Sequence, residues 1–423
     1  MSKLPIKILS LLLVFTAIFC HITSCTVRAN SEDLMDGISA NKVPEPDDLS
    51  AGNTKLTDFA VRMFKASFEN RENTNGNILI SPLSVLSALS MTMNGARGET
   101  LSQMEKTLGF TKDEVNNYLY GYCKNLTQNS KSRLVSANSM WIRDGERLSV
   151  KKEFLQANAD YYDADIFKAP FDESTLNEIN RWVEENTDGM IKKMIDRIPQ
   201  SAVMYLINAL TFDAEWNSVY EKAMVSEGIF NLANGDRIQV DFMHDTGYMP
   251  YFEDEHAKGF LRHYYGGKYA FAALLPDEGI SVDEYIKTMS GEKIHSLLSD
   301  AGYKEVRTSI PKFESEYSTD LSDTLKQMGI TDAFTNGKAD FTDIGTSSEG
   351  SIFIGRVLHK TYISVDEKGT KAGAATVVEM TDGAALVPED IKEVYLDRPF
   401  IYMLIDCDTN TPFFIGTIVN PEK

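Results

Sequence analysis

The sequence predicts an α+β fold built on large, mostly antiparallel β-sheets. Amphipathic helical patterns dominate the first half of the chain, whereas strand-like runs dominate the second half. This segregation argues against a doubly wound α/β sheet, in which helices and strands would alternate. The composition, with 43% apolar, 10% aromatic and 25% charged residues, is that of a globular protein with a substantial core.

Charge and motif content exclude several functional classes. A formal net charge of −20 argues against a nucleic-acid partner and against a polyanion cofactor, and we interpret it as favouring solubility. The chain has no G-x-S-x-G elbow, no H-E-x-x-H pair and no phosphate-binding glycine-rich loop, and its six histidines are scattered. We therefore predict no catalytic residues, no metal site and no cofactor.

The first 25 residues predict an export signal. Lys3 and Lys7 precede an apolar run over residues 8–19, which is too short to span a bilayer comfortably. Residues 22–25 resemble a bacterial lipobox, which implies lipidation of Cys25 and attachment to a membrane through acyl chains alone. The alternative is an ordinary secretory signal cleaved nearby. Either signal predicts an exported protein, extracellular or held at the cell surface as an outer-membrane lipoprotein.

Residues 26–52 are polar, acidic and contain Pro44 and Pro46, so they predict a flexible tether ahead of a single domain over residues 53–423. Within that domain, Cys123 and Cys407 could form one disulfide or remain as two buried thiols. We favour the thiols, because free cysteine is among the residues most often buried.

Helical patterns begin at residues 57–70, where apolar residues recur at helical spacing. Ser81 and Pro82 suit a helix cap and first turn, and Asn94 and Gly95 suit its end, so a second helix is predicted between them. Further helices are predicted at residues 112–126, 151–161, 173–186, 282–298 and 321–328.

Strand-like runs rich in β-branched and aromatic residues are predicted at residues 134–142, 203–212, 259–275, 306–313, 352–365 and 400–407. The most informative stretch, residues 365–378, follows one of these strands. Its small residues Thr370, Ala372, Ala374, Thr376 and Val378 would share one face of an extended segment. This alternation suits a loop that later enters between two existing strands, because bulky inward side chains would block entry.

This stretch resembles the hinge of the serpin reactive loop, and ten motifs in the family's order carry the resemblance from about residue 53 to the C-terminus. They lie at residues 77–84, 95–98, 179–189, 206–216, 311–313, 325–334, 357–360, 398–400, 414–416 and 420–421. The resemblance implies a serpin fold: one domain with three mostly antiparallel sheets, about nine helices and an exposed reactive loop at about residues 367–390.

The resemblance also implies a function. A serpin of the inhibitory type is a suicide substrate, whose loop is cleaved by a serine protease and then inserts into the main sheet while the protease is still covalently attached as an acyl-enzyme. The expected partner is therefore a target serine protease, bound by a monomer. The alternative is a non-inhibitory serpin-fold binding or decoy module at the cell surface.

Three groups of site residues carry over from the family by position. The hinge comprises Glu367, Gly369, Thr370, Ala372, Ala374 and Thr376. The shutter, where the sheet parts beneath the loop, comprises Ser81, Ser84, Asn208 and His359. The breach, where insertion starts, comprises Trp216, Lys312 and Glu367, and there we expect a Lys312–Glu367 ion pair unless both side chains simply face solvent.

The family's usual spacing from Glu367 places the scissile bond at Gly383–Ala384. Cleavage after Ala384 or Ala385 would suit an elastase-like protease with a small pocket, and cleavage after Met380 or Leu386 would suit a chymotrypsin-like or subtilisin-like enzyme. No arginine lies between the hinge and Pro388, so a trypsin-like target is not expected.

Overall fold

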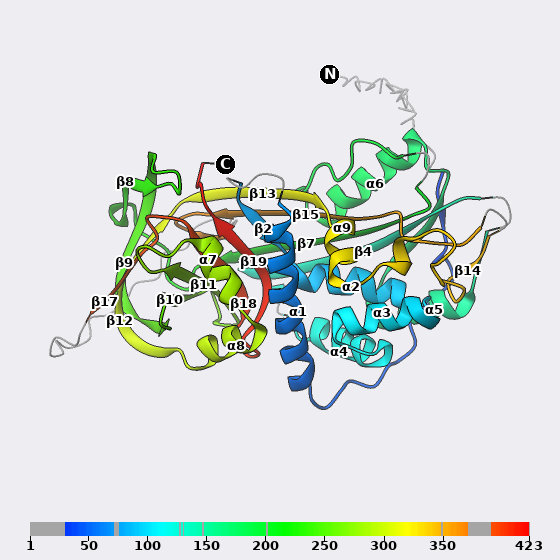
Figure 1. Ribbon diagram of the computed structural model, residues 1–423, viewed down its shortest axis with the longest axis horizontal. Helices are drawn as coiled ribbons and strands as arrows, with labels where there is room; N and C mark the ends of the chain where they lie inside the picture. Colours follow the sequence, from blue (N-terminus) through cyan, green and yellow to red (C-terminus); the bar gives the residue numbers. More distant parts are fainter. Residues whose placement is uncertain are drawn as a thin grey trace, which may run out of the picture.

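The computed structural model of the chain describes residues 30–71, 76–126, 128–129, 131–145, 148–199, 202–347, 350–370 and 391–422 (Figure 1). Within these ranges the chain forms nine α-helices and three sheets, as the family resemblance implies, and the sheets have eight, nine and two strands. Most neighbouring strands are antiparallel; the parallel pairs are β4–β6, β7–β15 and β12–β17. The fold is therefore α+β.

The helices are α1 (Ser50–Glu69), α2 (Pro82–Met93), α3 (Gly98–Leu108), α4 (Lys112–Lys124), α5 (Lys152–Tyr162), α6 (Glu173–Asn186), α7 (Val282–Thr288), α8 (Gly291–Ser299) and α9 (Ser322–Met328). Two short 3-10 turns lie at Lys222–Met224 and Asp332–Phe334.

The eight-stranded sheet has the order β1 (Glu32–Asp33), β6 (Asp165–Ala169), β4 (Ser132–Arg143), β7 (Met204–Glu215), β16 (Gly369–Thr370), β15 (Arg356–Val365) and β13 (Phe313–Asp320), with β3 (Gln128–Asn129) paired to β4. The nine-stranded sheet has the order β17 (Lys392–Tyr395), β12 (Gly302–Pro311), β9 (Arg237–Glu253), β10 (Ala257–His263), β11 (Tyr269–Pro276), β18 (Phe400–Asp406), β19 (Thr411–Ile418) and β2 (Ile78–Ile80), with β8 (Val225–Asn231) paired to β9. A two-stranded ribbon joins β14 (Gly345–Thr346) to β5 (Ser149–Val150).

Two predicted elements are each split in the structure. The helix predicted at 282–298 is broken by Met289, whose backbone is extended, and restarts where the Ser290 hydroxyl accepts the Lys293 amide. The strand predicted at 259–275 is a hairpin, because Gly266 and Gly267 both take positive φ and turn the chain between β10 and β11. Helix α3 and several strands were not predicted, among them β2, β6, β8, β9, β13 and β19.

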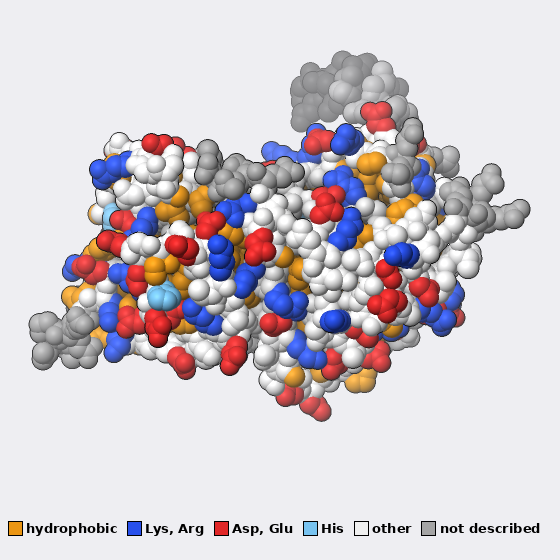
Figure 2. All heavy atoms as spheres, in the orientation of Figure 1, with side chains coloured by type: hydrophobic (Ala, Val, Ile, Leu, Met, Phe, Trp, Pro, Cys, Tyr) orange, Lys and Arg blue, Asp and Glu red, His pale blue; other side chains and the backbone are white. Residues whose placement is uncertain are grey.

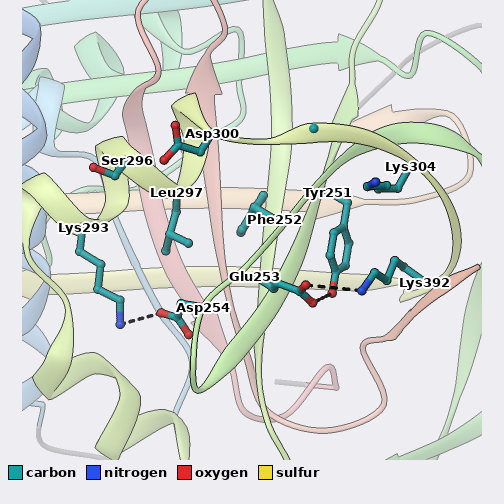
Figure 3. Close-up of a pocket in the computed structure, with 11 residues that line it drawn as sticks. Tyr251, Phe252, Glu253, Asp254, Lys293, Ser296, Leu297, Asp300, Lys304 and Lys392 are labelled. Carbon is teal, nitrogen blue, oxygen red and sulfur yellow. Dashed lines mark hydrogen bonds and ion pairs between the residues drawn. The ribbon is translucent and has the colours of Figure 1, made fainter. Parts of the chain in front are cut away.

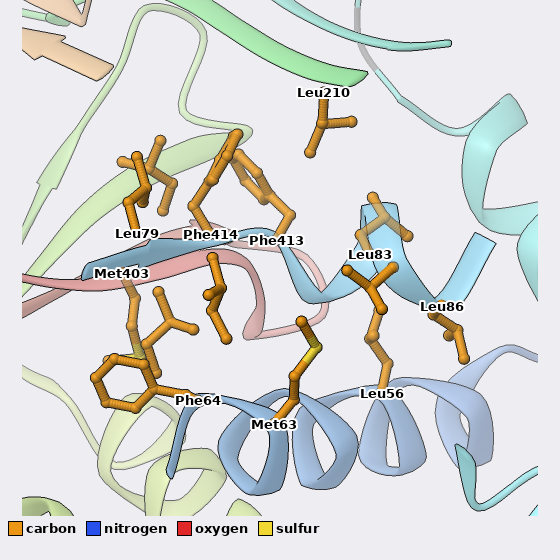
Figure 4. Packing of buried hydrophobic residues seen from close by; sticks show 14 of the residues in the cluster. Leu56, Met63, Phe64, Leu79, Leu83, Leu86, Leu210, Met403, Phe413 and Phe414 are labelled. Carbon is orange, nitrogen blue, oxygen red and sulfur yellow. The ribbon is translucent and has the colours of Figure 1, made fainter. Parts of the chain in front are cut away.

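Helix α2 is buried along its whole length, which places it at the centre of the molecule. The Ser81 hydroxyl caps it by accepting the Ser84 amide (3.3 Å), and Pro82 occupies its first turn, as predicted. Figure 4 shows Leu83 and Leu86 of α2 packed beside α1 and close to the aromatic side chains of β19. This core joins the helices to the nine-stranded sheet.

The eight-stranded sheet is covered on both faces. On β7, Tyr205 and Ile207 point to one face and contact the cluster that contains Trp182 of α6. Leu206 and Leu210 point to the opposite face and join the main core with α2. This period-two alternation is what a strand buried on both sides requires, and Figure 1 shows α6 and α2 on opposite sides of the sheet.

The N-terminal segment differs from the predicted tether where the structure describes it. In residues 30–49, β1 pairs with β6, the Asn41 amide donates to Asp160 (2.7 Å), and Tyr120 donates to the Val43 carbonyl (3.0 Å). The segment therefore lies against β6, α4 and α5. Val43 is buried, and Leu34, Met35, Ile38 and Leu49 pack against the main core. Most of the other residues are polar, which is why the composition suggested a free chain. Residues 26–29 and Cys25 lie outside the described ranges.

Cys123 and Cys407 are unpaired, as favoured, but Cys123 is exposed on α4 and Cys407 is only partly buried, so the expected burial of both is wrong. Figure 2 shows acidic and basic side chains interspersed over the visible face. None of the helices in the described ranges is long and apolar enough to cross a membrane.

Candidate functional site

The candidate site lies at one end of the eight-stranded sheet, where β15 reverses into β16. Asp366 makes this turn by accepting the amides of Lys368 (2.8 Å) and Gly369 (3.2 Å) on its carboxylate, while its own amide donates to the Gly369 carbonyl (2.9 Å). The two residues of β16 then run antiparallel to both neighbours. Thr370 pairs with Val365 of β15 and with Ala214 of β7.

Thr370 is the last residue described before the loop, and its side chain is only 1% exposed. Its hydroxyl forms a hydrogen bond of 2.6 Å with Tyr264, which is itself fully buried. The first predicted inward-facing hinge residue therefore already occupies the interior of the sheet. Ala372, Ala374 and Thr376 lie outside the described residues.

Strands β7 and β15 keep one register while they separate toward this end. They pair directly from Arg356 with Tyr205 to His359 with Asn208. Six residues further along each strand, Val365 and Ala214 face each other again, but now across Thr370. The sheet is thus closed at one end, and at the other end the first residues of a further strand occupy the space between β7 and β15.

Gly369 is required by close contact with β7. A Cβ atom at this position would lie 2.0 Å from the Ala214 carbonyl oxygen and 2.8 Å from Cα of Glu215. Both atoms belong to the backbone of a central strand, so neither can move away at low cost. The sequence assigned Gly369 to the hinge; the structure adds that the constraint comes from packing against β7.

We expect Gly369→Val to expel β16 from the sheet, because a branched side chain cannot share space with the Ala214 carbonyl. Hydrogen exchange at the Thr370 amide should accelerate by at least about tenfold, the equivalent of about 1.4 kcal/mol. Gly279→Val is a useful control, since nothing lies within 4 Å of a Cβ there, although its positive φ adds local strain. Unchanged protection in the Gly369 variant would contradict this assignment.

The predicted breach residue Trp216 binds the turn between β15 and β16. Its indole N–H donates to the Asp366 carbonyl (2.8 Å), and its backbone amide donates to the Lys368 carbonyl (2.8 Å). The indole also stacks on Tyr264 with 4.5 Å between ring centroids. Trp216 thus binds the turn and supports the ring that contacts Thr370.

Lys312 and Glu367 form the predicted ion pair, with 2.7 Å between Nζ and Oε2. The pair raises the pKa of Lys312 and lowers that of Glu367, mainly through their hydrogen bond. Both side chains remain about one-third exposed, so solvent weakens the attraction and the pair orients the turn rather than dominating its stability.

Beneath the hinge turn, the structure adds two residues that the sequence did not single out. Tyr264 lies far from the hinge in the sequence, and nothing in its local pattern marks it. Arg262 lies over the Tyr220 ring, 4.0 Å from its centroid, and forms an ion pair with Asp245 at 2.5 Å. Tyr264 and Arg262 thus add an aromatic ring and a cation to the side chains that lie beneath the hinge.

The predicted shutter residues gather where β7 and β15 pair directly. The Ser81 amide donates to Nε2 of His359 (3.1 Å), and Ser81, Ser84 and His359 are all buried. The backbone of Asn208 lies opposite His359, but its side chain lies outside the described part of the structure. Thr361, which was not predicted, donates its hydroxyl to the Leu79 carbonyl (2.7 Å).

Burial lowers the pKa of His359 to about 4 from an ordinary value of 6.5. The neutral ring accepts a hydrogen bond at Nε2, and the protonated ring has no acceptor there. The folded state therefore prefers the neutral ring, and the unfolded chain binds the extra proton between these pKa values.

We expect His359 to make the folded state pH-sensitive. Its contribution is fully present above about pH 6.5 and is lost as the pH falls toward about 4, by about 3 kcal/mol in total. Urea unfolding at pH 7 and pH 4.5 measures this loss, and His359→Gln should remove that part of the pH dependence. If the free energy of unfolding fell equally between pH 7 and pH 4.5 in the wild type and in His359→Gln, the assignment would be contradicted.

The scissile bond predicted at Gly383–Ala384, and the alternatives at Met380, Ala385 and Leu386, lie outside the described residues. The structure does fix both ends of the segment that contains them. Residues 371–390 connect β16 in the eight-stranded sheet to Ile391 and β17 in the nine-stranded sheet. A cut anywhere within this segment separates β16 from β17 and frees the hinge at its far end.

Comparisons with known proteins agree with this arrangement. Residues 54–421 match the family model described as serpin (serine protease inhibitor). The chain is 48% identical to tengpin, a thermophilic serpin. The match to the native-state structure of tengpin covers 92% of this chain and 100% of that chain, with a TM-score of 0.87. The match to the latent-state structure covers 88% of this chain and 99% of that chain, with a TM-score of 0.77. The chain is also 30% identical to human leukocyte elastase inhibitor over 88% of its own length and 99% of that protein. Its conformation is thus nearer to the native-state structure of tengpin.

Proposed function

This chain belongs to the serpin family, and we propose that it inhibits serine proteases as a suicide substrate. The observation that carries this proposal is Thr370, whose small side chain lies buried between β7 and β15 with no cleavage of the loop. An inhibitory hinge must enter the sheet at this position, and here the first step of entry is already accommodated.

The register of β16 determines what each further loop residue would meet. If the strand continues antiparallel from Thr370, residue 372 faces Ile363 and Phe212, and residue 374 faces Thr361 and Leu210. Ala372 and Ala374 are small enough for these positions. Thr376 would face His359 and Asn208, the first pair that β7 and β15 form directly. Insertion beyond residue 375 must therefore separate strands that are now bonded to each other.

Cleavage of the loop allows β7 and β15 to separate, because it releases the far end of the hinge from β17. A target protease binds the loop, and its serine attacks the scissile carbonyl to form an acyl-enzyme while the new amine end leaves with β17. The freed hinge then inserts and gains ladder hydrogen bonds on both edges. An inserted strand from Thr370 to Gly383 spans about 45 Å, so the attached protease is carried across the sheet. Distortion of its oxyanion hole slows deacylation, since losing one donor costs about 100- to 1,000-fold in rate.

We propose an elastase-like protease, or another enzyme with a small or apolar primary pocket, as the target. The support is the run Gly383-Ala384-Ala385-Leu386 in the loop and the absence of arginine between the hinge and Pro388. The similarity to human leukocyte elastase inhibitor favours the same class. We further propose that the protein is exported and carries lipid on Cys25, which supports action at a cell surface.

Incubation with a pancreatic-type elastase tests the inhibitory role. We expect a covalent complex that survives boiling in detergent, and a released C-terminal peptide that begins at Ala384, as read by mass spectrometry. A catalytic-serine variant of the elastase is the matched control and should give no complex. Complete clipping without any complex would indicate a decoy or binding module instead of an inhibitor.

A further inference from the structure

A pocket of about 790 Å³ lies between α8, the end of β9, the start of β12 and the first residue of β17 (Figure 3). This volume falls in the range of about 300–1,000 Å³ that is usual for sites that bind small ligands. None of the residues that line the pocket belongs to the hinge, the breach or the shutter. A ligand in this pocket would therefore contact a different part of the molecule from the inserting loop.

The floor of the pocket is apolar. Figure 3 shows the side chains of Phe252 and Leu297 in the middle of the pocket. Phe252 is buried, whereas Leu297 is only partly buried and packs against the main core. An apolar group placed over this floor would remove apolar surface from water, which favours its binding.

Four of the charged side chains around the pocket neutralise one another. Lys293 pairs with Asp254 at 2.7 Å, and Asp254 also accepts a hydrogen bond from the Tyr285 hydroxyl at 2.7 Å. Lys392 pairs with Glu253 at 3.4 Å. These groups already have partners, so they create no demand for a charged ligand.

Asp300 and Lys304 are different. Both line the pocket and are exposed, and neither forms an ion pair with any residue that the structure describes. Figure 3 shows them apart from each other on the side of the pocket opposite Asp254 and Glu253. Asp300 also stands at the C-terminal end of α8, where the helix dipole adds further negative potential. The pocket thus offers one site for a cation and one for an anion, with an apolar floor beside them.

The spacing of these two charges sets the length of a complementary ligand. The Cα atoms of Asp300 and Lys304 are four residues apart in the chain, so they lie at most about 14 Å from each other. A peptide of three residues spans about 10 Å between its termini when extended. Its terminal ammonium and carboxylate can therefore reach the two side chains at the same time, whereas a single amino acid is too short.

We propose that this pocket binds short apolar peptides with free termini. The N-terminal ammonium pairs with Asp300, the C-terminal carboxylate pairs with Lys304, and the apolar side chains cover Phe252 and Leu297. Proteolysis produces peptides of this kind, so they accumulate where proteases are active. The pocket thereby gives the protein a second binding activity, separate from the loop.

Calorimetric titration of the full-length protein with the peptide Leu-Leu-Leu tests this proposal. We expect saturable binding at one site, and Gly-Gly-Gly should bind at least about tenfold more weakly because it lacks the apolar side chains. N-acetylation or C-amidation of Leu-Leu-Leu removes one terminal charge each, and each should weaken binding by about three- to tenfold.

Two variants assign these charges to their partners. Asp300→Asn should weaken binding of free Leu-Leu-Leu by about three- to tenfold and leave binding of the N-acetylated peptide unchanged, because that peptide has no ammonium to lose. Lys304→Gln should behave in the same way toward the C-amidated peptide. Lys338→Gln, at an exposed lysine far from the pocket in the sequence, is the matched control and should bind as wild type does.

Three results would overturn the proposal: no saturable binding of Leu-Leu-Leu, equal affinity for the free and the capped peptides, or wild-type affinity in both variants. The titrations need no protease. A protein that binds the peptide as expected but fails to trap elastase would therefore refute the inhibitory function and leave the peptide site intact.

Discussion

Thr370→Arg is expected to turn the protein from an inhibitor into a substrate of its target. The Thr370 side chain is 1% exposed and is bonded to buried Tyr264, so an arginine there must lose its hydration without an acidic partner among the described neighbours. Burial of an unpaired charge costs several kcal/mol. Each increase of about 1.4 kcal/mol in the activation free energy of loop insertion slows insertion about tenfold. The acyl-enzyme then partitions about tenfold more toward hydrolysis.

The measurement is the number of inhibitor molecules consumed per protease molecule trapped, which should rise by at least about tenfold in Thr370→Arg. Thr370→Ser is the matched control, since it keeps a small side chain and a hydroxyl for Tyr264, and it should behave as wild type. An arginine variant that traps its protease with unchanged stoichiometry would show that the hinge does not insert at this position.

Cleavage of the loop by a protease that is not trapped should raise the melting temperature by about 20 °C. Full insertion adds a strand with neighbours on both edges, or on the order of ten additional hydrogen bonds worth about 1 kcal/mol each. For a chain of this size, each kcal/mol raises the melting temperature by about 2 °C. Differential scanning calorimetry before and after cleavage measures the change.

The Gly369→Val variant, cleaved in the same way, separates insertion from cleavage. Its hinge cannot occupy the space beside Ala214, so its melting temperature should rise far less than that of the cleaved wild type. An equal rise in both proteins would mean that stabilisation comes from the cut itself rather than from a new strand. An unchanged melting temperature in cleaved wild type would support a decoy.

The hinge was predicted from a local signal and from the resemblance to the serpin family, whereas the shutter was predicted by position through that resemblance. Small alternating residues mark the hinge, and a serine–proline cap marks the start of α2 beside His359. The sequence could not identify Tyr264 or Thr361, since each acts through a partner far away in the chain: Tyr264 through Thr370, and Thr361 through the Leu79 carbonyl. Ordinary buried tyrosines and threonines have the same local pattern.

Elements were missed where local pattern and tertiary contact disagree. Strand β9 contains Gly247 and Pro250, which usually interrupt strands, but its long pairing with β12 holds it extended. The N-terminal residues 30–49 looked unstructured because they are polar, yet their polar groups bind to neighbouring strands and helices. Composition averages over the segment, so it does not show that the few apolar side chains, among them Leu34 and Val43, pack against the folded domain.

The position of β19 has a consequence for how the molecule is made. This strand, formed by Thr411–Ile418, lies between β18 and β2, the last strand in the order of the nine-stranded sheet, and β2 comes from residues 78–80. A growing polypeptide therefore cannot complete this part of the sheet until β19 has been synthesised, and such distant pairing folds slowly. We infer that residues 78–80 remain without their partner strand while most of the chain is being made.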